Sequence, residues 1–167
     1  MKLKFTKMHG AGNDFVVIDA TKDAFNLSKQ KISKLSNRQL GIGFDQLLVV
    51  GSSTIKHADF SYRIFNADGG EVNQCGNGAR CFVTFVHDKK LTSKHEIVVE
   101  TRSGIIRPKL QDDGSVSVNM GPPIFDPVEI PILGISKNDK YALLIDGRQF
   151  EFGAVSMGNP HAVILAE

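Results

Sequence analysis

The segment CGNGARCFVTFVH, Cys75–His87, decides the fold that we expect for this chain. It starts with small polar residues and then becomes apolar on most faces of a helix, at Ala79, Cys81, Phe82, Val83, Phe85 and Val86. A helix that is apolar nearly all round has to be buried. We therefore predict a helix over Gly76–His87 that lies inside the molecule and is wrapped by the surrounding strands.

The sequence around this helix has the pattern of short strands joined by glycine turns. Only one further helix is predicted, between Ser28 and Arg38, with Ser28 as its N-cap. The expected strands are Leu3–Met8, Phe15–Ile18, Gln46–Val50, Ala58–Phe65, Ile97–Thr101, Ile105–Leu110, Val116–Met120, Tyr141–Ile145, Phe150–Val155 and Ala162–Leu165.

A proline-rich stretch interrupts this pattern for about fifteen residues after Met120, at Gly121, Pro122, Pro123, Pro127 and Pro131. We predict a domain boundary there, with a first domain over 1–120 and the incomplete start of a second domain over 121–167. Three strands without a covering helix are marginal on their own, because one face and both edges stay open.

The composition restricts the function classes. The 167 residues are 41% hydrophobic and 23% charged, which is typical of a globular protein. A net charge of +2 and short apolar runs predict neither a nucleic-acid partner nor a membrane partner. The first residues lack the apolar core of a signal peptide, so we expect a cytoplasmic protein.

The only two cysteines, Cys75 and Cys81, are expected to be free thiols. Six helical residues separate their α-carbons by roughly 9 Å, beyond the ~7 Å that a disulfide allows. Free thiols are typical of a reducing compartment.

Four clusters rich in glycine and asparagine are candidates for a site; they cover residues 9–14, 41–46, 66–80 and 158–161. The first cluster is not a dinucleotide-binding fingerprint, because Phe15 stands where the third glycine is needed and a strand follows. Each cluster alone could be an ordinary loop with positive-φ glycines. Four of them, each with an Asn or Gln nearby, favour a binding site.

Cys75 is the strongest catalytic candidate, because it precedes the buried helix and its sulfur would lie near the free amides of the helix N-terminus. That position favours a reactive thiolate, whereas Cys81 fits a buried, inert cysteine. The amides of Gly76, Asn77 and Gly78 form a potential anion site, and few basic residues nearby make a carboxylate a better ligand than a phosphate.

Four side-chain amides could orient a polar, zwitterionic ligand: Asn13, Gln46, Asn66 and Asn159. For His161, a proton-carrying role and a structural role remain open alternatives.

Five motifs together resemble the diaminopimelate epimerase family; they are His9–Phe15, Gly43–Gln46, Asn66–Gly69, Cys75–Cys81 and Gly158–His161. The resemblance runs along the whole chain in the family's order. It implies an α/β fold, a curved mixed β-sheet wrapped around a central apolar helix, in a first domain and the start of a second similar domain. It also implies a pyridoxal-independent, two-base isomerase that converts LL- to meso-diaminopimelate in lysine and peptidoglycan-precursor synthesis, with no cofactor, no metal site and a homodimeric assembly.

The resemblance also assigns roles to single residues. Cys75 corresponds to the first-domain acid/base, and His161 to the histidine that tunes how readily the catalytic thiols ionise. The substrate-binding positions are Asn13, Gln46, Asn66, Gly76, Asn77 and Asn159.

The family's second catalytic cysteine has no counterpart in this sequence, so we expect the chain to be inactive, or nearly so, on its own. Two alternatives remain. One is a non-catalytic, carboxylate-binding half-domain, and the other is another racemase or isomerase of the same fold.

Overall fold

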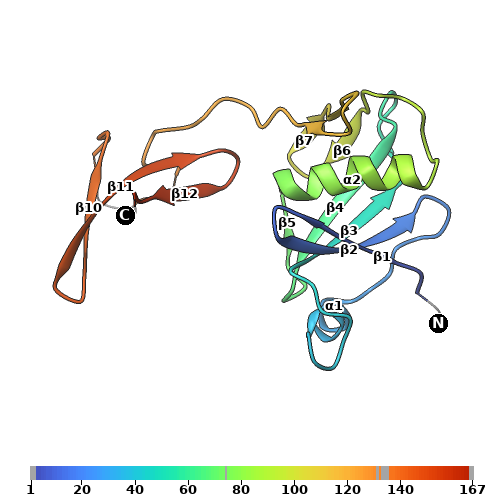
Figure 1. Ribbon diagram of the computed structural model, residues 1–167, viewed down its shortest axis with the longest axis horizontal. Coiled ribbons are helices and arrows are strands. Elements are labelled where there is room, and N and C mark those ends of the chain that lie inside the picture. Colours follow the sequence, from blue (N-terminus) through green and yellow to red (C-terminus); the bar gives the residue numbers. More distant parts are fainter. Residues whose placement is uncertain (1–2, 74, 131, 133–135, 166–167) are drawn as a thin grey trace. The chain divides into compact units, whose positions relative to one another are not determined.

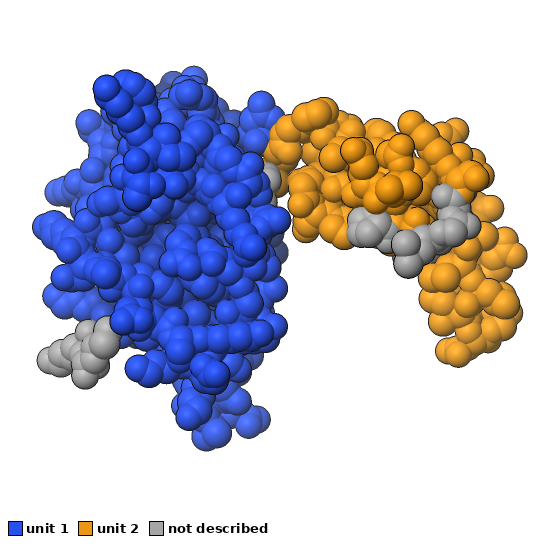
Figure 2. Space-filling view, turned by 180° about the vertical axis from the view of Figure 1, so that it is seen from behind, with its two compact units in different colours: residues 1–119 blue, residues 120–167 orange. Residues whose placement is uncertain are grey.

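A computed structural model shows how the chain folds. It describes residues 3–73, 75–130, 132 and 136–165. The chain divides into two compact units, residues 1–119 and residues 120–167, which Figure 2 colours separately.

The first unit is built on a seven-stranded mixed sheet with the order β1-β2-β3-β4-β6-β7, and β5 pairs with β4 (Figure 1). Its strands are β1 (Thr6–Gly10), β2 (Asn13–Ala20), β3 (Gln46–Gly51), β4 (Phe60–Asn66), β5 (Glu71–Val72), β6 (Val99–Thr101) and β7 (Gly104–Ile106). The β2–β3 and β4–β6 pairs are parallel, and the other pairs are antiparallel. Parallel neighbours need a crossover connection, and between β2 and β3 this connection contains helix α1 (Lys29–Ser36).

Helix α2 (Gly76–Asp88) crosses one face of this sheet (Figure 1). Its fully buried Phe82 packs in one apolar cluster with side chains that the neighbouring strands β2, β3 and β4 direct to this face, such as Phe15, Leu48 and Tyr62. Two further side chains, from β8 (Lys109–Leu110) and β9 (Val116–Ser117), pack against the same cluster. The predicted α/β fold, a mixed sheet against a central apolar helix, is confirmed.

The opposite face of the sheet is also covered. Val16 and Leu47 point to this side and pack in a second cluster with Ile32 of α1 and with the 25–27 segment. Burial on both faces explains why β2 and β3 are continuous apolar runs rather than alternating strands. The predicted N-cap of α1 is confirmed, because the Ser28 hydroxyl accepts a hydrogen bond of 3.4 Å from the Lys31 amide.

Several predicted strand limits were wrong for local reasons. β1 begins at Thr6 rather than Leu3 and extends to Gly10, because it forms a hairpin with β2 through Ala11 and Gly12, both at positive φ. The predicted strand Ile105–Leu110 is two strands, β7 and β8, since Pro108 lies between them and lacks an amide to donate.

Two more differences concern short elements of the first unit. The predicted strand Val116–Met120 is limited to β9, two residues long. The two-residue strand β5 was not predicted, because Glu71–Val72 is too short to show a period.

The second unit contains a three-stranded antiparallel sheet, β10 (Tyr141–Ile145), β11 (Arg148–Ser156) and β12 (Pro160–Val163). The third strand therefore starts two residues before the predicted Ala162–Leu165 and ends earlier. The small core of the unit consists of Ile130, Tyr141 and Ala154, and several apolar side chains, among them Leu144, are exposed. Pro131, which we placed in the boundary stretch, lies outside the described residues.

Candidate active site

Three of the predicted amide side chains lie at one end of the first unit's sheet. Asn13 and Gln46 begin β2 and β3, and Asn66 ends the antiparallel strand β4. In the strand register, Gln46 is opposite Asn66 and next to Phe15. The Gln46 Nε2 group donates a hydrogen bond of 2.9 Å to Asn66 Oδ1. The Gln46 Oε1 atom is buried and has no hydrogen-bond partner among the described residues.

Cys75 lies at the same end of the sheet, as the N-cap of α2. Its partly buried Sγ atom accepts a hydrogen bond of 3.4 Å from the Gly78 amide. The same sulfur is 3.8 Å from Asn13 Oδ1, with Cys75 as the donor. The structure therefore brings together Cys75 and Asn13, which are 62 positions apart in the sequence.

The Gly78 amide does not belong to the anion site that we predicted, since it donates to Cys75. The amides of Gly76 and Asn77 remain in the first turn of α2, where backbone N–H groups have no intrahelical acceptor. The Asn77 side chain does not extend from this turn freely, because its Oδ1 accepts a hydrogen bond of 2.9 Å from Arg80. A carboxylate at this N-terminus would thus meet two backbone amides.

The first turn of α2 is packed closely on the sheet, a contact that the sequence did not reveal. A Cβ atom at Gly78 would lie 2.3 Å from the hydroxyl of Tyr62 on β4. That hydroxyl is buried and has no hydrogen-bond partner among the described residues, and burial raises the pKa of Tyr62 well above its usual value. Glycine at position 78 is therefore required by space.

Cys81 differs from Cys75 in its surroundings. It is buried in the helix core, and burial raises the pKa of its thiol to about 11. The prediction that both cysteines are free is confirmed, and so is the burial of Cys81.

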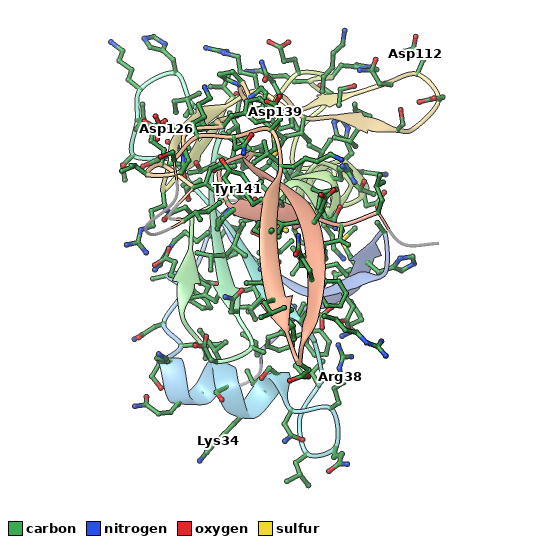
Figure 3. All side chains as sticks on the ribbon, turned by 90° about the vertical axis from the view of Figure 1, so that its left-hand side faces the viewer. Lys34, Arg38, Asp112, Asp126, Asp139 and Tyr141 are labelled. Carbon is green, nitrogen blue, oxygen red and sulfur yellow. The ribbon has the colours of Figure 1, made fainter. Side chains whose placement is uncertain are left out.

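A cluster of charged residues is hydrogen-bonded to Asn13 through Asp45. The sequence did not predict this contact. Asp14 accepts hydrogen bonds from Lys7 and Arg38, and Arg38, which follows α1 (Figure 3), also donates to Asp45 at 2.7 Å. Asp45 in turn accepts a hydrogen bond of 3.0 Å from Asn13 Nδ2. The Arg38 guanidinium, followed by Lys7, holds the pKa of the Asp14 carboxyl well below its usual range. The sequence signal for this cluster was Asp45, which belongs to the same motif as Gln46.

Asp14→Asn is expected to destabilise the chain at neutral pH and to have little effect in acid. Because the folded-state pKa of Asp14 is lowered, its stabilising contribution is fully present above about pH 4 and is lost as the pH falls through the lowered pKa. Thermal unfolding should give a melting temperature a few degrees lower for the variant at pH 7, with the two curves converging below pH 4. A constant difference at all pH values would contradict the ionic origin of the effect.

Asn159 and His161 belong to the second unit. The His161 Nδ1 atom lies 2.9 Å from the Asn159 carbonyl oxygen, and both residues are exposed. The structure thus relates these two residues to each other within the second unit.

A groove of about 720 Å³ lies elsewhere on the first unit, lined by residues 3–4, 18–20, 22–27, 89 and 91. It contains none of the candidate site residues. Within the described residues, no group of three or more His, Cys, Asp or Glu side chains is arranged to hold a metal ion. No helix in the described part of the chain is long and apolar enough to cross a membrane.

Comparisons with known sequences place this geometry in a family. The family model for diaminopimelate epimerase matches residues 5–125. The chain is 57% identical over 163 residues to the diaminopimelate epimerase of Nitrosospira multiformis, covering 98% of this chain and 58% of that protein. It is 50% identical over 167 residues to that of Teredinibacter turnerae, covering 100% of this chain and 60% of that protein. The chain therefore spans about three fifths of the curated relatives that it matches.

Solved structures with low sequence identity share the fold. A hydroxyproline epimerase from Agrobacterium vitis has a TM-score of 0.69 at 12% identity, covering 97% of this chain and 51% of that one. A phenazine biosynthesis protein of the PhzF family from Bacillus anthracis has a TM-score of 0.60 at 20% identity, covering 98% and 56%. At these identities the likeness concerns the fold alone.

Proposed function

The chain belongs to the diaminopimelate epimerase family, and from that premise we propose that it supplies the first-domain half of an enzyme that interconverts LL- and meso-diaminopimelate without pyridoxal. The observation that carries the proposal is Cys75 at the N-terminus of α2, beside Asn13 and at the sheet end where Gln46 and Asn66 meet. The product would serve lysine and peptidoglycan-precursor synthesis.

In this proposal Cys75 exchanges the α-proton of the substrate on one face of the α-carbon. An α-proton next to a carboxylate is very weakly acidic, so negative charge on the substrate has to be stabilised in the transition state. The Gly76 and Asn77 amides would bind the substrate carboxylate and supply this stabilisation. Asn13, Gln46 and Asn66 would orient the rest of the amino acid, and the unpaired Oε1 of Gln46 would be satisfied if the ligand ammonium reached it.

Inversion requires a second acid/base on the opposite face, since one base that returned its own proton would retain the configuration. Both cysteines of this sequence are on or next to α2, and Cys81 is buried with a pKa of about 11. We therefore propose that these 167 residues bind diaminopimelate and do not epimerise it by themselves.

We further propose that residues 121–167 are the start of a second domain. The exposed apolar side chains of its sheet, including Leu144 and Val163, support this assignment, as does the greater length of the relatives. The substrate-binding role of Asn159 and the thiol-tuning role of His161 rest on the family motif Gly158–His161. A cytoplasmic location is supported by the two free thiols, and a homodimer is implied by the family resemblance.

Calorimetry and α-deuterium exchange test this function on the full chain. We expect diaminopimelate to bind, and its α-position to take up deuterium slowly from D₂O with retention of configuration. Gln46→Leu should weaken binding roughly tenfold, as the loss of hydrogen bonds to a charged ligand predicts. Gln39→Leu, at an exposed position outside the site, is the matched control and should bind normally.

The outcomes separate the candidate functions. Normal epimerase turnover would contradict the need for a second acid/base from outside the sequence. Binding without any exchange would favour the non-catalytic carboxylate-binding reading. Preference for proline-type substrates in a panel of amino acids would favour another isomerase of the same fold.

A further inference from the structure

The side chain of Asn13 is held at both ends. Its Nδ2 group donates to Asp45 Oδ2 at 3.0 Å, and its Oδ1 atom lies 3.8 Å from Cys75 Sγ. Asp45 is itself held by two further hydrogen bonds. Its Oδ2 atom accepts one of 3.1 Å from the Asp14 amide, and its Oδ1 atom accepts one of 2.7 Å from Arg38. Asp45 therefore connects a charged surface cluster to the candidate catalytic thiol through one carboxamide.

The chemistry of Asp45 decides which way the Asn13 carboxamide points. An ionised carboxylate only accepts hydrogen bonds, so the group that faces Asp45 has to be the NH₂ of Asn13. The oxygen of the same carboxamide then faces the sulfur of Cys75. An asparagine without such a partner could present either end, because its two ends have nearly the same shape.

This orientation suits one protonation state of Cys75. A thiol can donate its proton to Asn13 Oδ1 while its sulfur accepts from the Gly78 amide. A thiolate at the same place would face a carbonyl oxygen without a proton between them. We propose that Asp45 is a positioning residue that keeps the Asn13 oxygen toward Cys75 and thereby favours the protonated, proton-donating thiol before substrate arrives. The inference deepens the proposed function and rests on it for the role of Cys75.

Other ionisable groups near Cys75 stay in one state around neutral pH. Tyr62 on β4 and Cys81 on α2 interact electrostatically with Cys75, and burial raises the pKa of both, so both are neutral. The other charged residues of the site are Lys7 and Arg38, which form ion pairs with Asp14, and Arg80 on α2, which donates to Asn77. Neither Tyr62 nor Cys81 therefore changes its charge around neutral pH.

The test is the rate at which iodoacetamide alkylates Cys75 in the full chain between pH 6 and 9, followed by mass spectrometry. In Asp45→Asn the residue at position 45 no longer dictates the Asn13 orientation, and an Asn13 N–H can turn to the sulfur. We expect alkylation at pH 7 to become roughly three- to tenfold faster, the effect of one hydrogen bond, with the profile displaced to lower pH. Arg38→Gln, which keeps the Asp45 carboxylate, is the matched control and should stay near the unmodified rate.

A double-variant cycle distinguishes orientation from charge, because removing the Asp45 charge would by itself favour a thiolate. If Asp45 acts through Asn13, Asp45→Asn has no further effect in the Asn13→Ala background. Any of three results would overturn the proposal. They are an unchanged alkylation rate in Asp45→Asn, the same acceleration by Asp45→Asn in the Asn13→Ala background, and an equal acceleration in Arg38→Gln. Because alkylation needs no diaminopimelate, failure of ligand binding would contradict the proposed function and leave this result standing.

Discussion

Replacing Cys75 with alanine is expected to slow the incorporation of iodoacetamide into the native chain at pH 7 by at least about a hundredfold. The only thiol left would be Cys81, which is buried and has a pKa of about 11, so about one molecule in 10⁴ carries it as thiolate at pH 7. Iodoacetamide reacts with the thiolate form of a cysteine. Cys75, in contrast to Cys81, is partly exposed at the start of α2. The measurement is the mass increase of the native chain with time.

Cys81→Ala is the matched control for this experiment. It removes the buried thiol and should leave the labelling rate close to that of the unmodified chain. Cys75→Ala should also remove the α-deuterium uptake from diaminopimelate. Fast labelling that persisted in Cys75→Ala would show that Cys81 is accessible and would contradict the packing of α2 against the sheet.

Gly78→Ala is expected to destabilise the chain by about 1–3 kcal/mol, the usual cost of forcing extra volume into a packed site. The new Cβ would lie 2.3 Å from the Tyr62 hydroxyl, and 3.3 Å from a methyl group of Leu48. Tyr62 is held in the core beside Phe82, with ring centroids 5.2 Å apart, so it cannot move aside cheaply. Urea unfolding of the two chains gives the difference.

The control for this prediction removes the clashing atom. Tyr62→Phe deletes a buried hydroxyl that has no partner among the described residues, so by itself it should cost little. In that background Gly78→Ala should lose most of its effect. If the destabilisation were the same with and without the hydroxyl, the close approach of α2 to β4 would not be its cause.

The sequence was most informative where local pattern determines structure. The apolar residues of Gly76–His87 predicted a buried helix, and the strand predicted over Ala58–Phe65 is present as β4, which packs against that helix. Ser28 was correctly predicted as an N-cap because its hydroxyl needs only the next turn of chain. The placement of Cys75 at the start of α2 followed from the same local reasoning.

The rest depends on contacts between distant segments. Asn13 and Asp45 are 32 positions apart, and nothing local to either residue indicates that they pair. The use of the Gly78 amide by Cys75, rather than by a ligand, depends on a side-chain orientation that the spacing does not determine.

The direct pairing of Gln46 with Asn66 has a consequence for how the site can vary. Along β3, the residue next to Gln46 points to one core cluster and the following residue, Leu48, points to the other. Sliding β3 by one position against β4 would reverse the faces of all these side chains together. The packing that makes the sheet stable therefore also sets the spacing of the amides that we propose to bind the ligand, and an insertion or deletion within β3 would disturb both in a single step.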